Sequence, residues 1–164
     1  MGLCTRDIMR TGVRSVRPEL GLPELEEEFV KERVTGFPVI EGDRLVGVIS
    51  RSDLVRRLVT ERTLEDYAST YYVDLSGFDD SPPLESLGEL AARTGARIET
   101  LTVGDMMTRA AITVSPDTPL ADLAALMRDR RVHRVPVTEE GRLVGIVSAL
   151  DFVGLVAEGR LVTP

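Results

Sequence analysis

The sequence predicts an α/β (α+β) fold in which two pseudo-symmetric β-α-β-β-α units pack into one module. Two observations carry this prediction. Residues 3–55 align with residues 101–153 at a constant offset of 98 without a gap, and nineteen of the 53 pairs are identical. Within each copy, the apolar residues follow the order strand, helix, strand, strand, helix. A repeat of this kind decides the architecture before any single motif is considered.

The composition excludes several classes of protein. The chain has 164 residues, of which 43% are hydrophobic and 29% charged, as in a soluble globular protein. Its net charge of −7 argues against binding to nucleic acid, which needs clustered Lys and Arg. No apolar run approaches the about 18 residues that cross a membrane, and no secretory signal is seen. The single cysteine permits no internal disulfide, so we expect a cytoplasmic protein. From the charge and the lack of a long apolar run, we expect neither nucleic acid nor a membrane as a partner.

Each copy begins with a short extended segment, at residues 15–16 and 113–114, which a proline closes two residues later. A helical pattern follows. In the second copy Thr118 is the expected N-cap and Pro119 the first helical residue. Leu20 stands at the position of this threonine in the first copy, so we expect the helix there to begin less cleanly.

A strand, a tight turn and a second strand follow in each copy, and the last helix begins at Ser50 or Ser148. The residues that we expect this helix to bury are Leu54, Val55 and Leu58 in the first copy and Phe152, Val153 and Val156 in the second. One such unit buries too little surface to be stable alone. We therefore expect the two copies to share one core.

The repeat divides the chain into a first unit (1–60), a connector (61–100) and a second unit (101–164). The connector holds all three tyrosines and a predicted helix that begins at Pro82 or Pro83 and ends near Thr94. It is either a structured linker packed on the module or an arm that contacts a partner or a second copy. The sequence leaves both interpretations open.

Catalysis finds little support in the sequence. One histidine, His133, and one cysteine, Cys4, fall in different copies. The chain has no Ser-His-Asp order, no paired-cysteine or zinc-protease motif and no glycine-rich phosphate loop. We therefore expect no catalytic residues, no metal site and no enzymatic activity.

The motif Ser-x-x-Asp occurs twice, as Ser50 to Asp53 and as Ser148 to Asp151, and each follows an apolar strand and opens a helix. One interpretation is a capping box, which satisfies the free N–H groups of the first helical turn. The other is a ligand site, because a helix N-terminus attracts anions and a carboxylate can accept bonds from two hydroxyls of a ribose. The two interpretations use the same geometry.

The second copy also carries a basic segment. Residues 128–134 hold four arginines and end in His133 and Arg134. These side chains either stabilise the end of the preceding helix or bind phosphate oxygens, of which an arginine can engage two at once. A basic cluster in an otherwise acidic chain suits a small anionic ligand.

Taken together, two copies of Asp-x-Met, Thr/Ser-Val-x-Pro, Pro-Val, Leu-Val-Gly and Ser-x-x-Asp resemble a tandem pair of cystathionine β-synthase (CBS) domains, the Bateman module. The resemblance covers both repeats and leaves residues 60–100 aside. It implies β-α-β-β-α units related by a pseudo-twofold axis, a ligand such as AMP, ADP or ATP, less often S-adenosylmethionine or NAD, and a homodimer.

The resemblance also implies roles for individual residues. The Asp of each Ser-x-x-Asp holds the ribose and the Ser lies near the phosphates, while the first extended segment contacts the adenine and the basic pair meets phosphate. The residues at these positions are Asp151, Ser148, Thr113, Val114, His133 and Arg134 in the second copy and Asp53, Ser50, Ser15 and Val16 in the first.

The first copy departs from this pattern, because Thr35 and Gly36 replace the basic pair. Arg51 is a candidate to compensate for the missing charge. We expect unequal sites, with the stronger one at Asp151. The resulting hypothesis is a non-catalytic module that senses an adenine nucleotide and acts on a separately encoded effector. The alternative is a dimerisation or protein-interaction module that needs no ligand.

Overall fold

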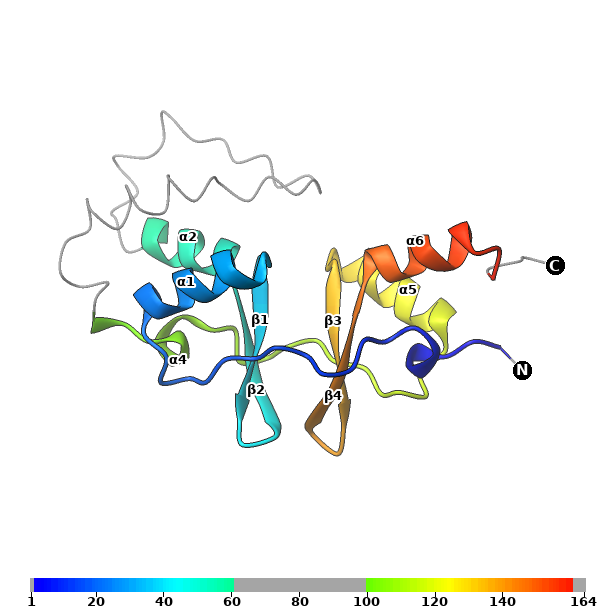
Figure 1. The fold of residues 1–164 in the computed structure, drawn as a ribbon, viewed down its shortest axis with the longest axis horizontal. Helices are drawn as coiled ribbons and strands as arrows, with labels where there is room; N and C mark the ends of the chain where they lie inside the picture. Colours follow the sequence, from blue (N-terminus) through cyan, green and yellow to red (C-terminus); the bar gives the residue numbers. More distant parts are fainter. Residues whose placement is uncertain (1, 61–99, 161–164) are drawn as a thin grey trace, which may run out of the picture. The chain divides into compact units, whose positions relative to one another are not determined.

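The computed structural model describes residues 2–60 and 100–160, with only the backbone of residues 57–60. The helix predicted in the connector and the three tyrosines lie outside this part. The elements are η1 Thr5–Asp7, α1 Leu22–Glu32, β1 Gly36–Glu41, β2 Arg44–Ser50, α2 Arg51–Thr60, α4 Val103–Met106, α5 Leu120–Arg130, β3 Arg134–Glu139, β4 Arg142–Ser148 and α6 Ala149–Ala157 (Figure 1). This order confirms the predicted fold class.

Each copy has a helix, a β-hairpin and a second helix, as the repeat predicted. The first strand of each copy is reduced to one residue. Val16 forms a parallel bridge with Val39, and Val114 forms the equivalent bridge with Val137. The prediction of a short extended segment at the start of each copy is therefore confirmed, at its minimal length.

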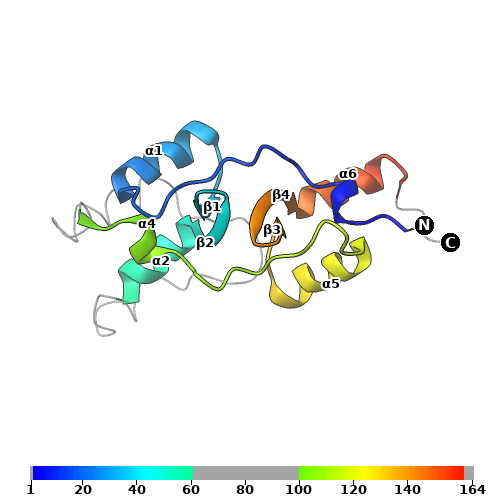
Figure 2. The same cartoon turned by 90° about the horizontal axis from the view of Figure 1, so that it is seen from below.

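The compact units of the structure exchange the start of each copy. The second-copy unit contains residues 2–14, the hairpin tip 42–45 and residues 111–160. The first-copy unit contains the remaining described residues, 15–41, 46–60 and 100–110. In Figures 1 and 2 the dark blue N-terminal segment accordingly lies beside α5, and the green segment with α4 lies beside α1 and α2.

The exchanged segments supply the caps of α1 and α5. The N–H of Leu22 donates to the carbonyl of Leu101 at 3.2 Å, and the N–H of Leu120 donates to the carbonyl of Leu3 at 3.1 Å. These carbonyls satisfy N–H groups that have no partner within a helix. The N-cap predicted at Thr118 is wrong, because its hydroxyl accepts from the N–H of Ser115 and the helix begins after Pro119 without a side-chain cap.

The exchanged segments also explain two of the repeated motifs. The methionine of Asp-x-Met lies against the glycine of Leu-Val-Gly, so that a Cβ at Gly145 would lie 2.9 Å from Met9 Sδ and 3.1 Å from the carbonyl oxygen of Arg10. A Cβ at Gly47 would lie 2.9 Å from Met107 Sδ. Both glycines therefore allow a close approach that no larger residue permits.

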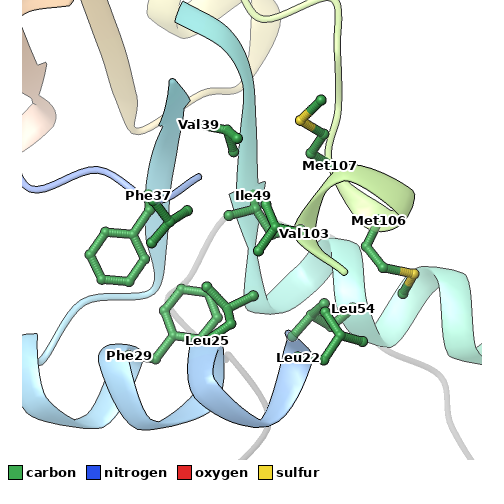
Figure 3. Close-up of a cluster of buried hydrophobic side chains, with 11 residues drawn as sticks. Leu22, Leu25, Phe29, Phe37, Val39, Ile49, Leu54, Val103, Met106 and Met107 are labelled. Carbon is green, nitrogen blue, oxygen red and sulfur yellow. The ribbon is translucent and has the colours of Figure 1, made fainter. Parts of the chain in front are cut away.

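The buried side chains form two clusters, so the expectation of one core shared by both copies is wrong. Each cluster instead draws on both copies. In the first-copy unit, Val103, Met106 and Met107 pack with the residues around Phe29 (Figure 3). The rings of Phe29 and Phe37 stack there with centroids 5.3 Å apart. The exchange thus completes a hydrophobic core that one copy alone does not close.

The outer face of α6 differs from the prediction. Val153 and Val156, expected in the core, are 59% and 63% exposed, whereas Leu155 is buried. The apolar residues of α6 lie all around the helix, so their spacing did not reveal which side faces inward. Leu150 is also exposed, and α6 therefore presents an apolar face outside the core.

The Met9 contact predicts opposite effects for two glycine substitutions in the second-copy unit. Gly145→Ala should lower the free energy of unfolding by about 1–3 kcal/mol, because the new methyl overlaps Met9 Sδ. Gly154 lies in α6, and no atom lies within 4 Å of a Cβ added there. Gly154→Ala should therefore raise the free energy of unfolding by about 0.5–1 kcal/mol. Urea unfolding of both variants measures the two effects. Equal changes in the free energy of unfolding of both variants would contradict the close contact between Gly145 and Met9.

Candidate functional site

The carboxylates of the two Ser-x-x-Asp motifs open the last helix of each copy. Asp151 Oδ2 accepts from the N–H and from the hydroxyl of Ser148, both at 2.7 Å. In the first copy, Asp53 Oδ2 accepts from the N–H of Ser50 at 2.9 Å and from its hydroxyl at 2.6 Å. The capping box is thus confirmed in both copies. It uses one oxygen of each carboxylate.

The second oxygen of each carboxylate contacts a residue of the exchanged segments. Arg10 Nε donates to Asp151 Oδ1 at 2.9 Å. At the equivalent position of the repeat, the hydroxyl of Thr108 donates to Asp53 Oδ1 at a longer 3.4 Å. The guanidinium of Arg56 also approaches Asp53 Oδ1, at 3.9 Å. The two carboxylates therefore differ in the side chain that the exchanged segment brings to them, a guanidinium at Asp151 and a hydroxyl at Asp53.

Sequence reasoning missed both Arg10 and Thr108. Each follows the methionine of Asp-x-Met directly, and each is held by paired backbone hydrogen bonds to the second strand of a hairpin, Arg10 to Ile146 and Thr108 to Val48. The repeat contained a usable signal, because the offset of 98 aligns an arginine with a threonine next to an identical motif. Only the exchange shows which carboxylate each one meets.

The charge of Asp151 is stabilised by its neighbours. Burial by itself would raise the pKa of this carboxyl group. The hydrogen bonds from Ser148 and the guanidinium of Arg10 outweigh burial and lower the pKa below its ordinary value. Asp151 therefore stays ionised and keeps its full capacity to accept hydrogen bonds.

The basic pair lies at the same end of the β3–β4 hairpin as the capping box. Arg134 is the register partner of Ser148, and the carbonyl of His133 accepts from the N–H of Ala149 at 2.9 Å. Both basic residues are exposed. The structure thus brings His133 and Arg134 together with Ser148 and Asp151 around the first turn of α6.

In the first copy, the carbonyl of Thr35 makes the equivalent bond to the N–H of Arg51 at 3.0 Å. The guanidinium of Arg51 lies over the ring of Phe29, 5.4 Å from its centroid. This contact holds the side chain against the hydrophobic core. Whether Arg51 compensates for the missing basic pair stays a prediction.

Of the four residues expected to contact the adenine, two are buried and two reach the surface. Val114 and Val16 are buried, and their backbone groups are used by hydrogen bonds to the first strand of the hairpin. Thr113 is exposed and Ser15 is half-buried. Their positions leave Thr113 and Ser15, rather than the valine side chains, accessible to a ligand.

Comparison with known proteins identifies the family. The family model of the CBS domain matches residues 6–60 and 103–158, which are the two copies of the repeat. The chain belongs to the CBS domain family. This CBS pair is 33% identical over 160 residues to the uncharacterized protein MJ1426 of Methanocaldococcus jannaschii, covering 90% of this chain and 88% of that protein.

Solved CBS pairs share the fold. The crystal structure of Arabidopsis thaliana CBSX2 in complex with AMP has a TM-score of 0.69 and 27% identity, covering 97% of this chain and 99% of that one. The CBS pair spans 56% of the length of full CBSX2. The CBS domain pair of MJ0100, in complex with 5-methylthioadenosine and S-adenosylmethionine, has a TM-score of 0.66 at 19% identity over 97% and 99% of the two chains, which shows the fold alone.

The described part of the CBS pair has neither a membrane-spanning helix nor a metal-binding cluster. In residues 2–60 and 100–160, no helix has the length and apolar character that crossing a membrane requires. The same residues hold no group of three or more His, Cys, Asp or Glu placed to bind a metal ion.

The lowered pKa of Asp151 predicts a pH dependence of stability. The stabilisation from its charge is fully present above the ordinary value of 3.8 and is lost as the pH falls from there through the lower pKa of the folded state. The gap in unfolding free energy between the wild type and Asp151→Asn should therefore narrow on acidification. Urea unfolding from about pH 7 to about pH 3 measures this gap.

Asp7, whose pKa is lowered by the hydrogen bond from the N–H of Cys4, is present in both proteins and cancels in the comparison. A gap that stays constant, or widens, as the pH falls would contradict the proposed stabilisation of the Asp151 carboxylate.

Proposed function

We propose that this CBS pair is a non-catalytic regulatory module that binds an adenine nucleotide, AMP, ADP or ATP, at the site around Asp151. The observation that carries the proposal is the arrangement at the start of α6. One ionised carboxylate lies beside Arg10, and Arg134 and His133 flank the same helical turn. The complex of CBSX2 with AMP supports this choice of ligand.

The chemistry of the site suits a ribose phosphate. Asp151 Oδ1 accepts from Arg10 Nε, and a ribose hydroxyl would donate to the same oxygen in competition with the guanidinium. The first turn of α6 and the guanidinium of Arg134 favour an anion at the same end of the hairpin. Thr113, exposed on the preceding segment, is a candidate contact for the base.

The first copy is proposed as the weaker site. Asp53 has the same capping box, but its Oδ1 accepts from the Thr108 hydroxyl at 3.4 Å and pairs with the exposed Arg56 only at 3.9 Å. Thr35 and Gly36 supply no basic side chain, and Arg51 lies on Phe29. Ser15, Val16, Ser50 and Asp53 therefore form a site with less positive charge to hold a phosphate.

A second proposal concerns assembly. The exposed face of α6, formed by Leu150, Val153 and Val156, carries no charged residue. The rest of the chain carries a net charge of −7, which opposes association except through an uncharged face. Such a face is complementary to itself under twofold symmetry. We propose that α6 pairs with α6 of a second molecule of this chain. In the resulting homodimer, a separate effector would recognise whether the ligand is bound.

Ligand binding predicts a selective thermal shift. AMP at about 100 times its dissociation constant should add about 2.7 kcal/mol to the free energy of unfolding. Asp151→Asn should remove most of this gain, and the matched variant Asp53→Asn should keep it. Isothermal titration calorimetry of the three proteins gives affinity and stoichiometry. Unchanged melting with AMP, ADP and ATP alike would overturn the nucleotide proposal, and equal losses in both variants would overturn the inequality of the sites.

Pairing through α6 predicts an effect of charge on that helix alone. Val153→Glu should convert a dimer into a monomer, because two carboxylates would meet in an apolar contact. Val30→Glu, which places the same charge at an exposed valine of α1, should leave the dimer intact. Size-exclusion chromatography with light scattering measures both masses. A monomeric wild type, or a Val153→Glu variant of unchanged mass, would refute the pairing.

A further inference from the structure

The two carboxylate sites differ at one pair of equivalent positions in direct contact with the carboxylates, Arg10 and Thr108. Arg10 donates from its guanidinium to Asp151 at 2.9 Å, whereas Thr108 donates from its hydroxyl to Asp53 at 3.4 Å. The guanidinium nearest to Asp53 Oδ1 is that of Arg56 in α2, at 3.9 Å. The Asp151 side chain is only 9% exposed, whereas that of Arg10 is 72% exposed. The carboxylate thus depends on the arginine for its charge balance, while the arginine remains open to a further partner.

We propose, on the basis of the nucleotide function above, that Arg10 determines the specificity of the Asp151 site. It makes the site select adenosine compounds that carry a phosphate over those that do not. The residue comes from the exchanged N-terminal segment, so the segment that completes the core also sets the class of ligand.

Arg10 and a ribose hydroxyl would compete for one oxygen of Asp151. A ribose hydroxyl that donates to Asp151 Oδ1 meets Arg10 Nε already bonded there. A neutral nucleoside weakens this ion pair and offers the guanidinium no anion in return. A nucleotide brings phosphate oxygens, which a guanidinium can bind through its remaining N–H groups while it stays beside the carboxylate. Only the phosphorylated ligand offsets the cost of disturbing the pair.

The backbone around Arg10 makes this sharing feasible. Its N–H and its carbonyl both bond to Ile146 of β4, at 2.9 and 3.0 Å. The main chain is therefore fixed, whereas the exposed side chain can change its rotamer. The guanidinium can reorient toward a ligand without any release of the N-terminal segment from the core.

The charge of Arg10 also discriminates against cationic ligands. S-adenosylmethionine carries a positive sulfonium in the place where a nucleotide carries its phosphate. Arg10 and Arg134 would face this cation with charge of the same sign. The site should therefore prefer AMP over both adenosine and S-adenosylmethionine.

The test is Arg10→Thr, which gives the Asp151 site the side chain found at Thr108. We expect the ratio of AMP affinity to adenosine affinity to fall by about tenfold, because AMP loses a charged hydrogen bond and adenosine loses a competitor. S-adenosylmethionine should bind more tightly than to the wild type. Isothermal titration calorimetry of the full chain with AMP, adenosine and S-adenosylmethionine gives the three affinities.

The matched control is Arg6→Thr. Arg6 lies on the same segment and pairs with the exposed Asp117, so the variant loses the same charge away from Asp151. It should keep the wild-type preference. Arg10→Lys retains the charge without the planar guanidinium and should recover part of the preference for AMP.

The outcomes separate this inference from the function on which it rests. A wild type that binds none of the three probes overturns the proposed function itself. A wild type that binds AMP, with an unchanged ratio in a folded Arg10→Thr variant, overturns only the role of Arg10. Equal falls in Arg6→Thr and Arg10→Thr would reduce the effect to net charge and also refute it. If Arg10→Thr does not fold, an unchanged ratio in Arg10→Lys decides against the proposal.

Discussion

The exchange of the starting segments of the two copies is the constraint on which the rest of the structure depends. Residues 2–14 complete the second-copy core, and residues 100–110 complete the first. Three kinds of interaction hold each segment: a backbone carbonyl that caps a helix, a methionine on a strand glycine and a pair of hydrogen bonds to the second strand of a hairpin. Because each segment supplies an essential part of the other copy's unit, neither copy closes its hydrophobic cluster with its own residues alone.

The same exchange makes two identical motifs chemically different. Ser50 to Asp53 and Ser148 to Asp151 form the same capping box, with one oxygen facing the helix. The other oxygen of each carboxylate accepts from a side chain at the start of the other copy, Thr108 in one case and Arg10 in the other. The repeated motif thus determines the local geometry, while a segment outside the motif determines which donor reaches the second oxygen.

The parts of the structure that were predictable are those that local sequence determines. The order of elements followed from the repeat, and the capping boxes from the spacing of Ser and Asp. The inward side of α6 was not predictable, since apolar residues surround that helix and only packing distinguishes Leu155 from Val153. The contact between Arg10 and Asp151 was not predictable either, because 141 positions separate the two residues and they lie in different copies of the repeat.

Capping and ligand binding need not be alternatives at Asp151. The capping bonds fall on Oδ2, and they lower the pKa of the carboxyl group together with Arg10, so the residue is held ionised and oriented before any ligand arrives. Such preorganisation reduces the ordering cost of binding. Oδ1 then remains as the oxygen through which a ligand can exchange with a protein cation. The capping box therefore fixes one oxygen of each carboxylate in the same way, and the second oxygen meets the position that differs between the copies, Arg10 or Thr108.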